Sequence, residues 1–163
     1  YLTQWYDLKV PILTAHMGAT VNAQDFIDKH KKQMEGCIVN NRFWPGPFTP
    51  LSMDLLKQYK EKSGMEATNF AVQHHDGTLA MLTAIKNAGS TDKDKIVEAI
   101  EKGTFTAIWG DIKYTPLEDG HRNPTKMVVV QIQGGKKVPI YPVDLAEKLG
   151  SKWMPVPPWP WEK

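Results

Sequence analysis

The chain has 163 residues, of which 41% are hydrophobic and 23% are charged, so it has the composition of a folded protein with a core of its own. Its net charge is +2, from 20 basic and 18 acidic side chains, and this balance gives no electrostatic basis for binding nucleic acid or a membrane surface. The sequence contains no run of about 18 apolar residues, the length that a membrane-spanning helix needs.

The single cysteine and the first residues limit the remaining classes. Cys37 has no partner for a disulfide within the chain, and it lies in the apolar run Cys37–Val39, where a buried and unreactive thiol is expected. The chain begins at Tyr1 without the charged and apolar segments of a signal peptide. We therefore expect either a leader that has been removed or a chain that begins within a longer protein.

The first part of the chain predicts an alternation of helices and strands. Residues 2–8 are typical of the end of a helix, and the aliphatic residues within 9–14 predict a short buried strand. A loop of small residues, Met17–Thr20, follows that strand. Asn22 is then expected to be the N-cap of a helix over residues 23–33.

A second strand is predicted over residues 37–40, after Gly36 ends the preceding helix. The next segment, Phe43–Pro50, contains three prolines and a glycine, and this composition excludes regular structure. Its last two residues, Thr49 and Pro50, are typical of an N-cap followed by the first residue of a helix.

Three helices are predicted after this segment. Apolar residues recur with a spacing of four over residues 51–63, and Gly64 ends that helix. A capping-box pattern at Thr91–Asp94 begins the third helix, which Gly103 ends. The second helix, over residues 68–87, has an apolar stripe that we expect to face the core, with Phe70, Leu79 and Met81 beside it. The stripe consists of Ala71, His75, Thr78, Leu82 and Ile85.

The last third of the chain changes from helical to alternating periodicity. Strands are predicted over residues 111–115, 126–133 and 136–143, with Gly134–Gly135 as the turn of a hairpin. The order of elements therefore predicts an α/β fold, with a Rossmann-like parallel sheet, flanking helices and an antiparallel C-terminal hairpin.

The final residues, Trp153–Lys163, form a tail rich in proline and tryptophan. We expect an extended segment that docks on its own protein, and a proline-rich ligand for a partner domain is the alternative.

The sequence carries no recognisable catalytic or metal-binding pattern. Its five histidines include no pair with the His-x-x-x-His spacing of a helical metal site, and no Cys-x-x-Cys occurs. The nucleophile elbow, the phosphate-binding loop and the dinucleotide fingerprint are also missing. We therefore expect neither an enzyme nor a cofactor.

Five segments in this order resemble the second half of the solute-binding proteins of branched-chain amino acid (Leu/Ile/Val) ABC transporters. The resemblance covers nearly the whole chain, although that family is about twice as long. The segments are Trp5–Ile12, Glu35–Val39, Ala84–Lys102, Phe105–Tyr114 and Gly135–Pro142.

This resemblance implies part of the type I periplasmic binding protein fold, with two lobes joined by crossing segments. Residues 1–42 and 110–145 would belong to the C-terminal lobe, residues 43–50 to a hinge crossing, and residues 51–109 to helices of the N-terminal lobe. Residues 146–163 would form the tail. The implied mechanism is hinge closure on a solute and delivery to a membrane permease, in the periplasm or outside the cell.

The resemblance also implies a ligand site. The family's loop at the cleft falls on Met17, Gly18, Ala19 and Thr20, and Thr20 stands where close relatives place an acidic residue that contacts the ligand's ammonium group. Because a hydroxyl cannot neutralise that charge, an amide, a carboxylate or an aromatic acid becomes a better ligand than an ordinary amino acid. Phe70 matches an apolar contact in the cleft, and His74 and the hinge residues Phe43 and Trp44 could also reach it.

The predicted function is the solute-binding component of an ABC-type importer. The alternatives are a self-associating interaction module, which would pair with a second copy or with a missing N-terminal half, and a ligand-sensing domain that has no transport role. A binding protein predicts stabilisation by a ligand, and an interaction module predicts a stable dimer without that response.

Overall fold

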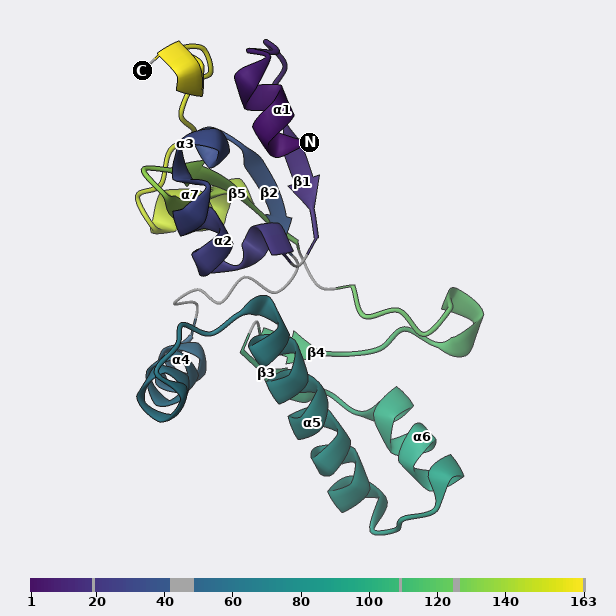
Figure 1. The fold of residues 1–163 in the computed structure, drawn as a ribbon. Helices are drawn as coiled ribbons and strands as arrows, with labels where there is room; N and C mark the ends of the chain where they lie inside the picture. Colours follow the sequence, from purple (N-terminus) through teal and green to yellow (C-terminus); the bar gives the residue numbers. More distant parts are fainter. Residues whose placement is uncertain (19, 42–48, 109, 125–126, 163) are drawn as a thin grey trace. The chain divides into compact units, whose positions relative to one another are not determined.

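A computed structural model describes residues 1–18, 20–41, 49–108, 110–124 and 127–162. The chain divides into two compact units, which Figure 1 shows with their secondary structure. Unit 1 comprises Tyr1–Arg42 and Lys126–Lys163, and unit 2 comprises Phe43–Thr125. Each unit has its own sheet, so each is described by itself.

Unit 1 is built on a four-stranded sheet with the order β1-β2-β5-β6. The strands are β1 (Ala15–Met17), β2 (Ile38–Asn41), β5 (Val128–Gln133) and β6 (Lys136–Tyr141). β1 and β2 are parallel, whereas β2 pairs with β5, and β5 with β6, in antiparallel fashion. The mixed sheet, together with the helices that flank it, is the α/β architecture that the sequence predicted.

Short helices complete unit 1 beside its sheet. They are α1 (Leu2–Asp7), η1 (Thr20–Asn22), α2 (Gln24–Lys29), α3 (Lys31–Met34), α7 (Val143–Lys148) and η3 (Pro160–Glu162). Ile27 of α2 and Met34 of α3 are fully buried, as are the paired residues Val39 and Val130 of the sheet. These aliphatic side chains form the core because removing them from water is the main driving force for folding.

The hairpin turn predicted at Gly134–Gly135 is confirmed. Gly134 and Gly135 connect β5 to β6, and both have positive φ angles, of 60° and 79°. Gln133 and Lys136 are register partners on either side of the two-residue turn. Such a turn requires the left-handed backbone conformation that glycine adopts without strain.

Two predictions in the first part of unit 1 were wrong. Residues 9–14 form no strand: the Trp5 indole N–H donates to the Ile12 carbonyl at 3.0 Å, and the Val10 N–H donates to the Trp5 carbonyl. These contacts fold the segment back onto α1, so the strand begins only at Ala15. The helix predicted over residues 23–33 is divided at His30 into α2 and α3, and its N-cap is Ala23 instead of Asn22.

Unit 2 contains three helices and a two-stranded antiparallel sheet. The helices are α4 (Pro50–Ser63), α5 (Asn69–Ala88) and α6 (Lys93–Lys102), and they confirm the three predicted from the sequence. β3 (Phe105–Ala107) pairs with β4 (Gly110–Ile112), and η2 (Leu117–Asp119) follows. Thr49 caps α4 in a reciprocal capping box with Ser52, which satisfies two backbone N–H groups at the helix start.

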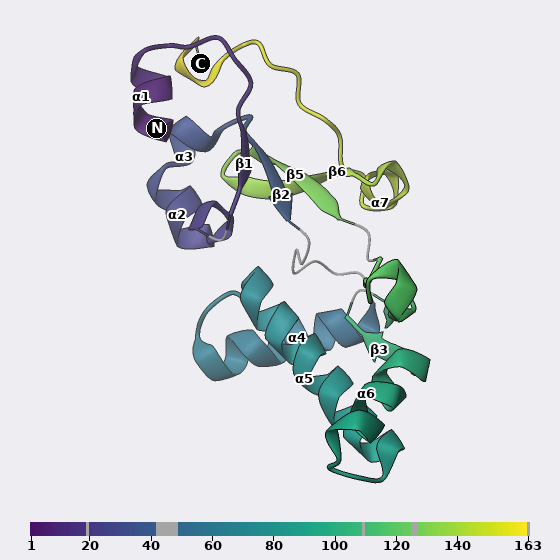
Figure 2. The ribbon, with the colours of Figure 1, turned by 90° about the vertical axis from the view of Figure 1, so that its right-hand side faces the viewer.

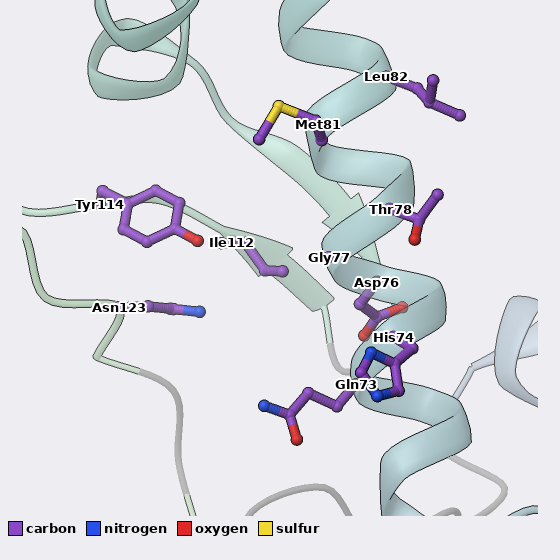
Figure 3. Close-up of a pocket in the computed structure, with 10 residues that line it drawn as sticks. All are labelled: Gln73, His74, Asp76, Gly77, Thr78, Met81, Leu82, Ile112, Tyr114 and Asn123. Atoms are coloured by element: carbon purple, nitrogen blue, oxygen red, sulfur yellow. The ribbon is translucent and has the colours of Figure 1, made fainter.

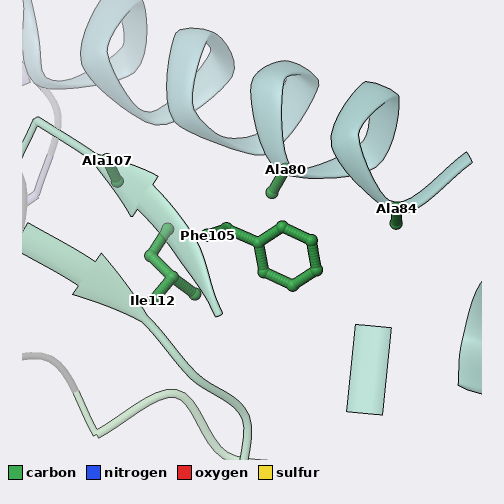
Figure 4. Packing of buried hydrophobic residues seen from close by; sticks show 5 residues of the cluster. All are labelled: Ala80, Ala84, Phe105, Ala107 and Ile112. Carbon is green, nitrogen blue, oxygen red and sulfur yellow. The ribbon is translucent and has the colours of Figure 1, made fainter. Parts of the chain in front are cut away.

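The core of unit 2 lies where α5 meets the small sheet. Figure 4 shows the Phe105 ring beside the small side chains of α5, Ala80 and Ala84, which leave room for it. Ala107 and Ile112 complete the buried cluster, and α6 adds the partly buried Ile96, Ala99 and Ile100. An aromatic ring against alanines is a size-matched packing that a larger residue on α5 would disturb.

The face of α5 that is buried differs from the predicted one. Val72, Asp76, Ala80 and Ala84 are the buried residues of α5, whereas Leu82, a member of the predicted stripe, is 59% exposed. The helix therefore has two faces with apolar residues, and the face with the smaller side chains packs against β3 and α6.

Unit 2 also includes residues that follow its helices. β4 pairs with β3, and this pairing places residues 110–124 in unit 2, whereas the resemblance implies that residues 110–145 belong to the same lobe of a larger protein as residues 1–42. The chain enters unit 1 again before Val128. The assignment of the units to the lobes of a larger protein remains a prediction.

Candidate functional site

One edge of the unit 1 sheet carries the loop that the sequence singled out. β1 ends at Met17, which is paired with Asn40 at the corresponding end of the parallel strand β2. The chain leaves unit 1 after Asn41 and re-enters before Val128, and these two residues are register partners at the same edge. Open α/β sheets bind ligands at the carboxyl ends of their parallel strands, so this edge is the favoured place for a site in unit 1.

The loop at this edge is held by a buried asparagine. The Nδ2 group of Asn22 donates to the Gly18 carbonyl at 2.6 Å, and Asn22 is only 4% exposed. Met17, Gly18 and Thr20 are exposed to solvent, whereas the backbone of the loop is held by the hydrogen bond from Asn22. This role of Asn22 was not predicted, because an asparagine before a helical pattern is also typical of an N-cap.

Three buried polar atoms at or near this edge have no hydrogen-bond partner among the described residues: His16 Nε2, Asn22 Oδ1 and Asn40 Oδ1. Burial lowers the pKa of His16 below its ordinary value, because the imidazolium form loses hydration, so the ring is neutral at pH 7. Buried polar groups without partners are rare and concentrate where water or a ligand supplies the missing bond. The described residues 17–18, 20–22 and 38–41 include no ionisable side chain.

In unit 2, the predicted site residues lie on α5. Thr68 caps the helix by accepting from the Ala71 N–H, and Phe70 and His74 follow within the first two turns. Phe70 is 47% exposed and His74 is exposed, so both side chains are accessible from solvent.

His74 lies on the wall of an open cavity of about 520 Å³ within unit 2. Figure 3 shows Tyr114, Asn123 and Ile112 facing α5 across this cavity. The other lining residues are Gln73, Asp76, Gly77, Thr78, Met81 and Leu82 of α5. Polar groups and apolar side chains both line the cavity, as is usual for sites that bind small molecules.

The carboxylate of Asp76 is already engaged within the protein. Asp76 is 4% exposed, its Oδ1 accepts from the Ile108 N–H at 3.3 Å, and the same oxygen lies 3.0 Å from His75 Nδ1. It therefore ties α5 to the end of β3 and is unsuited to neutralise a ligand's charge.

The structure places the predicted site residues in two groups. Met17, Gly18 and Thr20 lie together at the sheet edge of unit 1, and Phe70 and His74 lie on α5 of unit 2. Ala19, Phe43 and Trp44, also named as candidates, lie outside the described residues.

The described part of the chain holds no metal cluster and no membrane-spanning helix. No group of three His, Cys, Asp or Glu residues there could hold a metal ion. None of the described helices is long and apolar enough to cross a bilayer.

Comparison with known proteins places this geometry in context. Residues 8–137 match the family described as periplasmic binding protein. The leucine-binding protein LivK of Thermotoga maritima is 26% identical, with a TM-score of 0.72 over 88% of this chain and 41% of that one. No curated protein sequence matches the chain.

Two further solved structures share the fold. The leucine-, isoleucine-, valine-, threonine- and alanine-binding protein of Brucella ovis is 20% identical with a TM-score of 0.72, over 85% of this chain and 38% of that one. The branched-chain amino acid transporter substrate-binding protein LivJ of Streptococcus pneumoniae, in complex with isoleucine, is 15% identical with a TM-score of 0.70, over 83% and 38%. The chain thus spans about two fifths of the length of these proteins.

Proposed function

Since the chain belongs to the periplasmic binding protein family, we propose that it is the solute-binding part of an ABC-type importer, which binds a small molecule outside the cytoplasm and presents it to a membrane permease. The family and the solved relatives are solute-binding proteins and not enzymes. Because the chain spans about two fifths of those relatives, the periplasmic or extracellular location and the permease partner are parts of this proposal.

The observation that carries the proposal is the edge of the unit 1 sheet. This edge combines the exposed loop after β1, the buried acceptors of Asn22 and Asn40, and both connections of the chain to unit 2. A ligand bound there would act next to the segments about which two units can close. In unit 2, Phe70, for which the family resemblance implies an apolar ligand contact, and His74 are both accessible on α5.

The charges favour a particular class of ligand. The described residues of this edge offer no carboxylate for an ammonium group, and His16 is neutral at pH 7. The ligand would therefore be recognised through hydrogen bonds and an apolar contact with Phe70. An amide, or a carboxylic or aromatic acid, fits this pattern better than an ordinary amino acid, whose ammonium group would remain unpaired.

A thermal-shift screen against amino acids, amides, short carboxylic acids and aromatic acids tests the proposal. A ligand at a hundredfold excess over its Kd stabilises the protein by about 2.7 kcal/mol, and we expect one chemical class to give such a shift. Phe70→Ala should reduce the shift, because it removes the apolar contact. Leu79→Ala, another substitution on the exposed surface of α5, should leave it unchanged. If no compound stabilises the protein, the proposal that this chain binds a small molecule is wrong.

Self-association is the second candidate, and the exposed face of α5 favours it. Phe70, Met81 and Leu82 are all exposed although the helix pattern predicts that such residues are buried. In a longer protein, the part of the fold that this chain does not cover would pack there instead. Light scattering should show a dimer that Leu82→Glu converts to a monomer, and a monomeric mass without that substitution excludes self-association.

A further inference from the structure

The C-terminal tail of unit 1 is bound along its length to the rest of that unit. Figure 2 shows the segment leaving α7, passing beside the sheet and ending near α1. The tail holds one 3-10 turn, η3, and its other described residues are in neither a helix nor a strand. The contacts of the tail with β5 and α1 confirm the prediction that it docks on its own protein.

Two glutamines of β5 hold the near end of the tail: Gln133 Nε2 donates to the Lys152 carbonyl at 2.8 Å, and Gln131 binds the backbone of Met154. Gln131 is fully buried; its Nε2 group donates to the Met154 carbonyl at 2.9 Å, and its Oε1 accepts from the Met154 N–H at 2.8 Å. The side-chain amide thus pairs with the tail backbone as the peptide group of a neighbouring strand would. Nε2 also donates to the Gly36 carbonyl, and Oε1 accepts from Gln133, so the hydrogen-bonding capacity of the amide is fully used.

Tryptophan rings hold the far end of the tail. Trp161 contacts Trp5 of α1 edge to face, with ring centroids 5.1 Å apart, and it contacts Tyr6 at 6.1 Å. Trp159 stacks on Trp161 with an interplanar angle of 9°. Edge-to-face and stacked aromatic pairs of this kind each contribute beyond the area that they bury.

Trp5, the ring that receives the tail, is linked to the strand that precedes the candidate site. Trp5 is buried, and its indole N–H donates to the Ile12 carbonyl. Three residues after Ile12, the chain enters β1, which ends at Met17 in the exposed loop. Trp161 is therefore connected to β1 through its ring contact with Trp5, the hydrogen bond from Trp5 to Ile12 and a short stretch of chain.

We propose that Lys152–Glu162 act as a strap, which fixes α1 through Trp161 and so sets the position of β1 and of the loop that follows it. The two anchors are of different kinds: Gln131 binds the tail backbone to the sheet, and Trp161 binds the aromatic end to α1. This positioning role goes beyond solute binding, because it concerns the free protein and needs no ligand.

Hydrogen exchange on the ligand-free full chain tests the strap. Trp161→Ala should raise amide exchange about tenfold in α1 and residues 10–17, because Trp5 loses its aromatic partner and the segment opens locally. Exchange in the β5–β6 hairpin should stay unchanged. Trp153→Ala is the matched control, since Trp153 belongs to the same tail but is exposed, and it should alter neither region.

The pattern of exchange separates a positioning role from a general loss of stability. A uniform rise over α1, β1 and the β5–β6 hairpin would show that Trp161 only stabilises unit 1, and this result would overturn the strap. Unchanged exchange in residues 10–17 would also overturn it. Since no ligand is added, either result is independent of the thermal-shift screen, and the failure of one proposal leaves the other standing.

Discussion

Replacing Phe105 by alanine is expected to lower the free energy of unfolding of unit 2 by about 3–5 kcal/mol. Phe105 is 2% exposed and packs between the alanines of α5 and the apolar side chains of α6. Gly103 lies directly against the ring, since a Cβ at this position would be 2.6 Å from a ring carbon of Phe105. Because Gly103 has no side chain, it cannot fill the space that the ring leaves. The cost should therefore include both the lost burial and the cavity that remains.

Hydrogen exchange in urea measures this change for each unit separately. The amides of α5 and α6 should exchange faster in Phe105→Ala, while those of β5 and β6 in unit 1 serve as an internal reference. Phe70→Ala removes the same side chain from a half-exposed position of α5, and its stability should change by less than about 1 kcal/mol. Similar losses for the two variants would contradict the core that the structure assigns to unit 2.

The elements that could be predicted from the sequence are those with local signals at their ends. The Gly134–Gly135 hairpin and the Thr49 cap of α4 depend on residues within a few positions of each other, and both were recognised. The segment 9–14 was misread because its conformation depends on a contact with Trp5, which a window of apolar residues does not reveal.

The apolar periodicity of α5 predicts a helix, but it does not show which side of the helix packs against β3 and α6. Of the predicted stripe, Thr78 and Leu82 are exposed and Ala71, His75 and Ile85 are half-buried, whereas the alanine-rich side that is buried has a weaker apolar pattern in the sequence. Small residues are favoured there because the Phe105 ring occupies the space beside them. The loop Met17–Thr20 was expected after a strand over residues 9–14, whereas the strand is Ala15–Met17, and the bond from Asn22 to the Gly18 carbonyl was not predicted because an asparagine before a helical pattern is also typical of an N-cap.

Replacing Gln131 by methionine should lower the free energy of unfolding of unit 1 by about 2–4 kcal/mol. Methionine is similar in length and apolar, so it fills the space but removes the hydrogen bonds that the amide makes with the Met154 N–H, the Met154 carbonyl and the Gly36 carbonyl. A buried group that loses its hydrogen bond costs the free energy of its lost hydration, and several such groups meet at this position. The near end of the tail should detach.

The alkylation rate of Cys37 reports this loss directly. Cys37 is buried in unit 1, and burial raises the pKa of its thiol to about 11, so in the folded protein it reacts very slowly with iodoacetamide at pH 8. The raised pKa also means that this thiol contributes stability below its unfolded pKa and loses that contribution as the pH rises towards 11. At pH 8, therefore, faster alkylation of Gln131→Met reports opening of unit 1.

Gln58→Met is the matched control for this substitution. Gln58 donates to Asp54 on the exposed surface of α4 in unit 2, so its loss should change stability by less than about 0.5 kcal/mol and leave the alkylation of Cys37 unchanged. If Gln131→Met alkylates at the rate of the unchanged chain, losing the amide does not open unit 1, and the stability assigned to its hydrogen bonds is wrong. The bond from Gln133 to the Lys152 carbonyl and the ring contacts of Trp161 would then be sufficient to hold the tail.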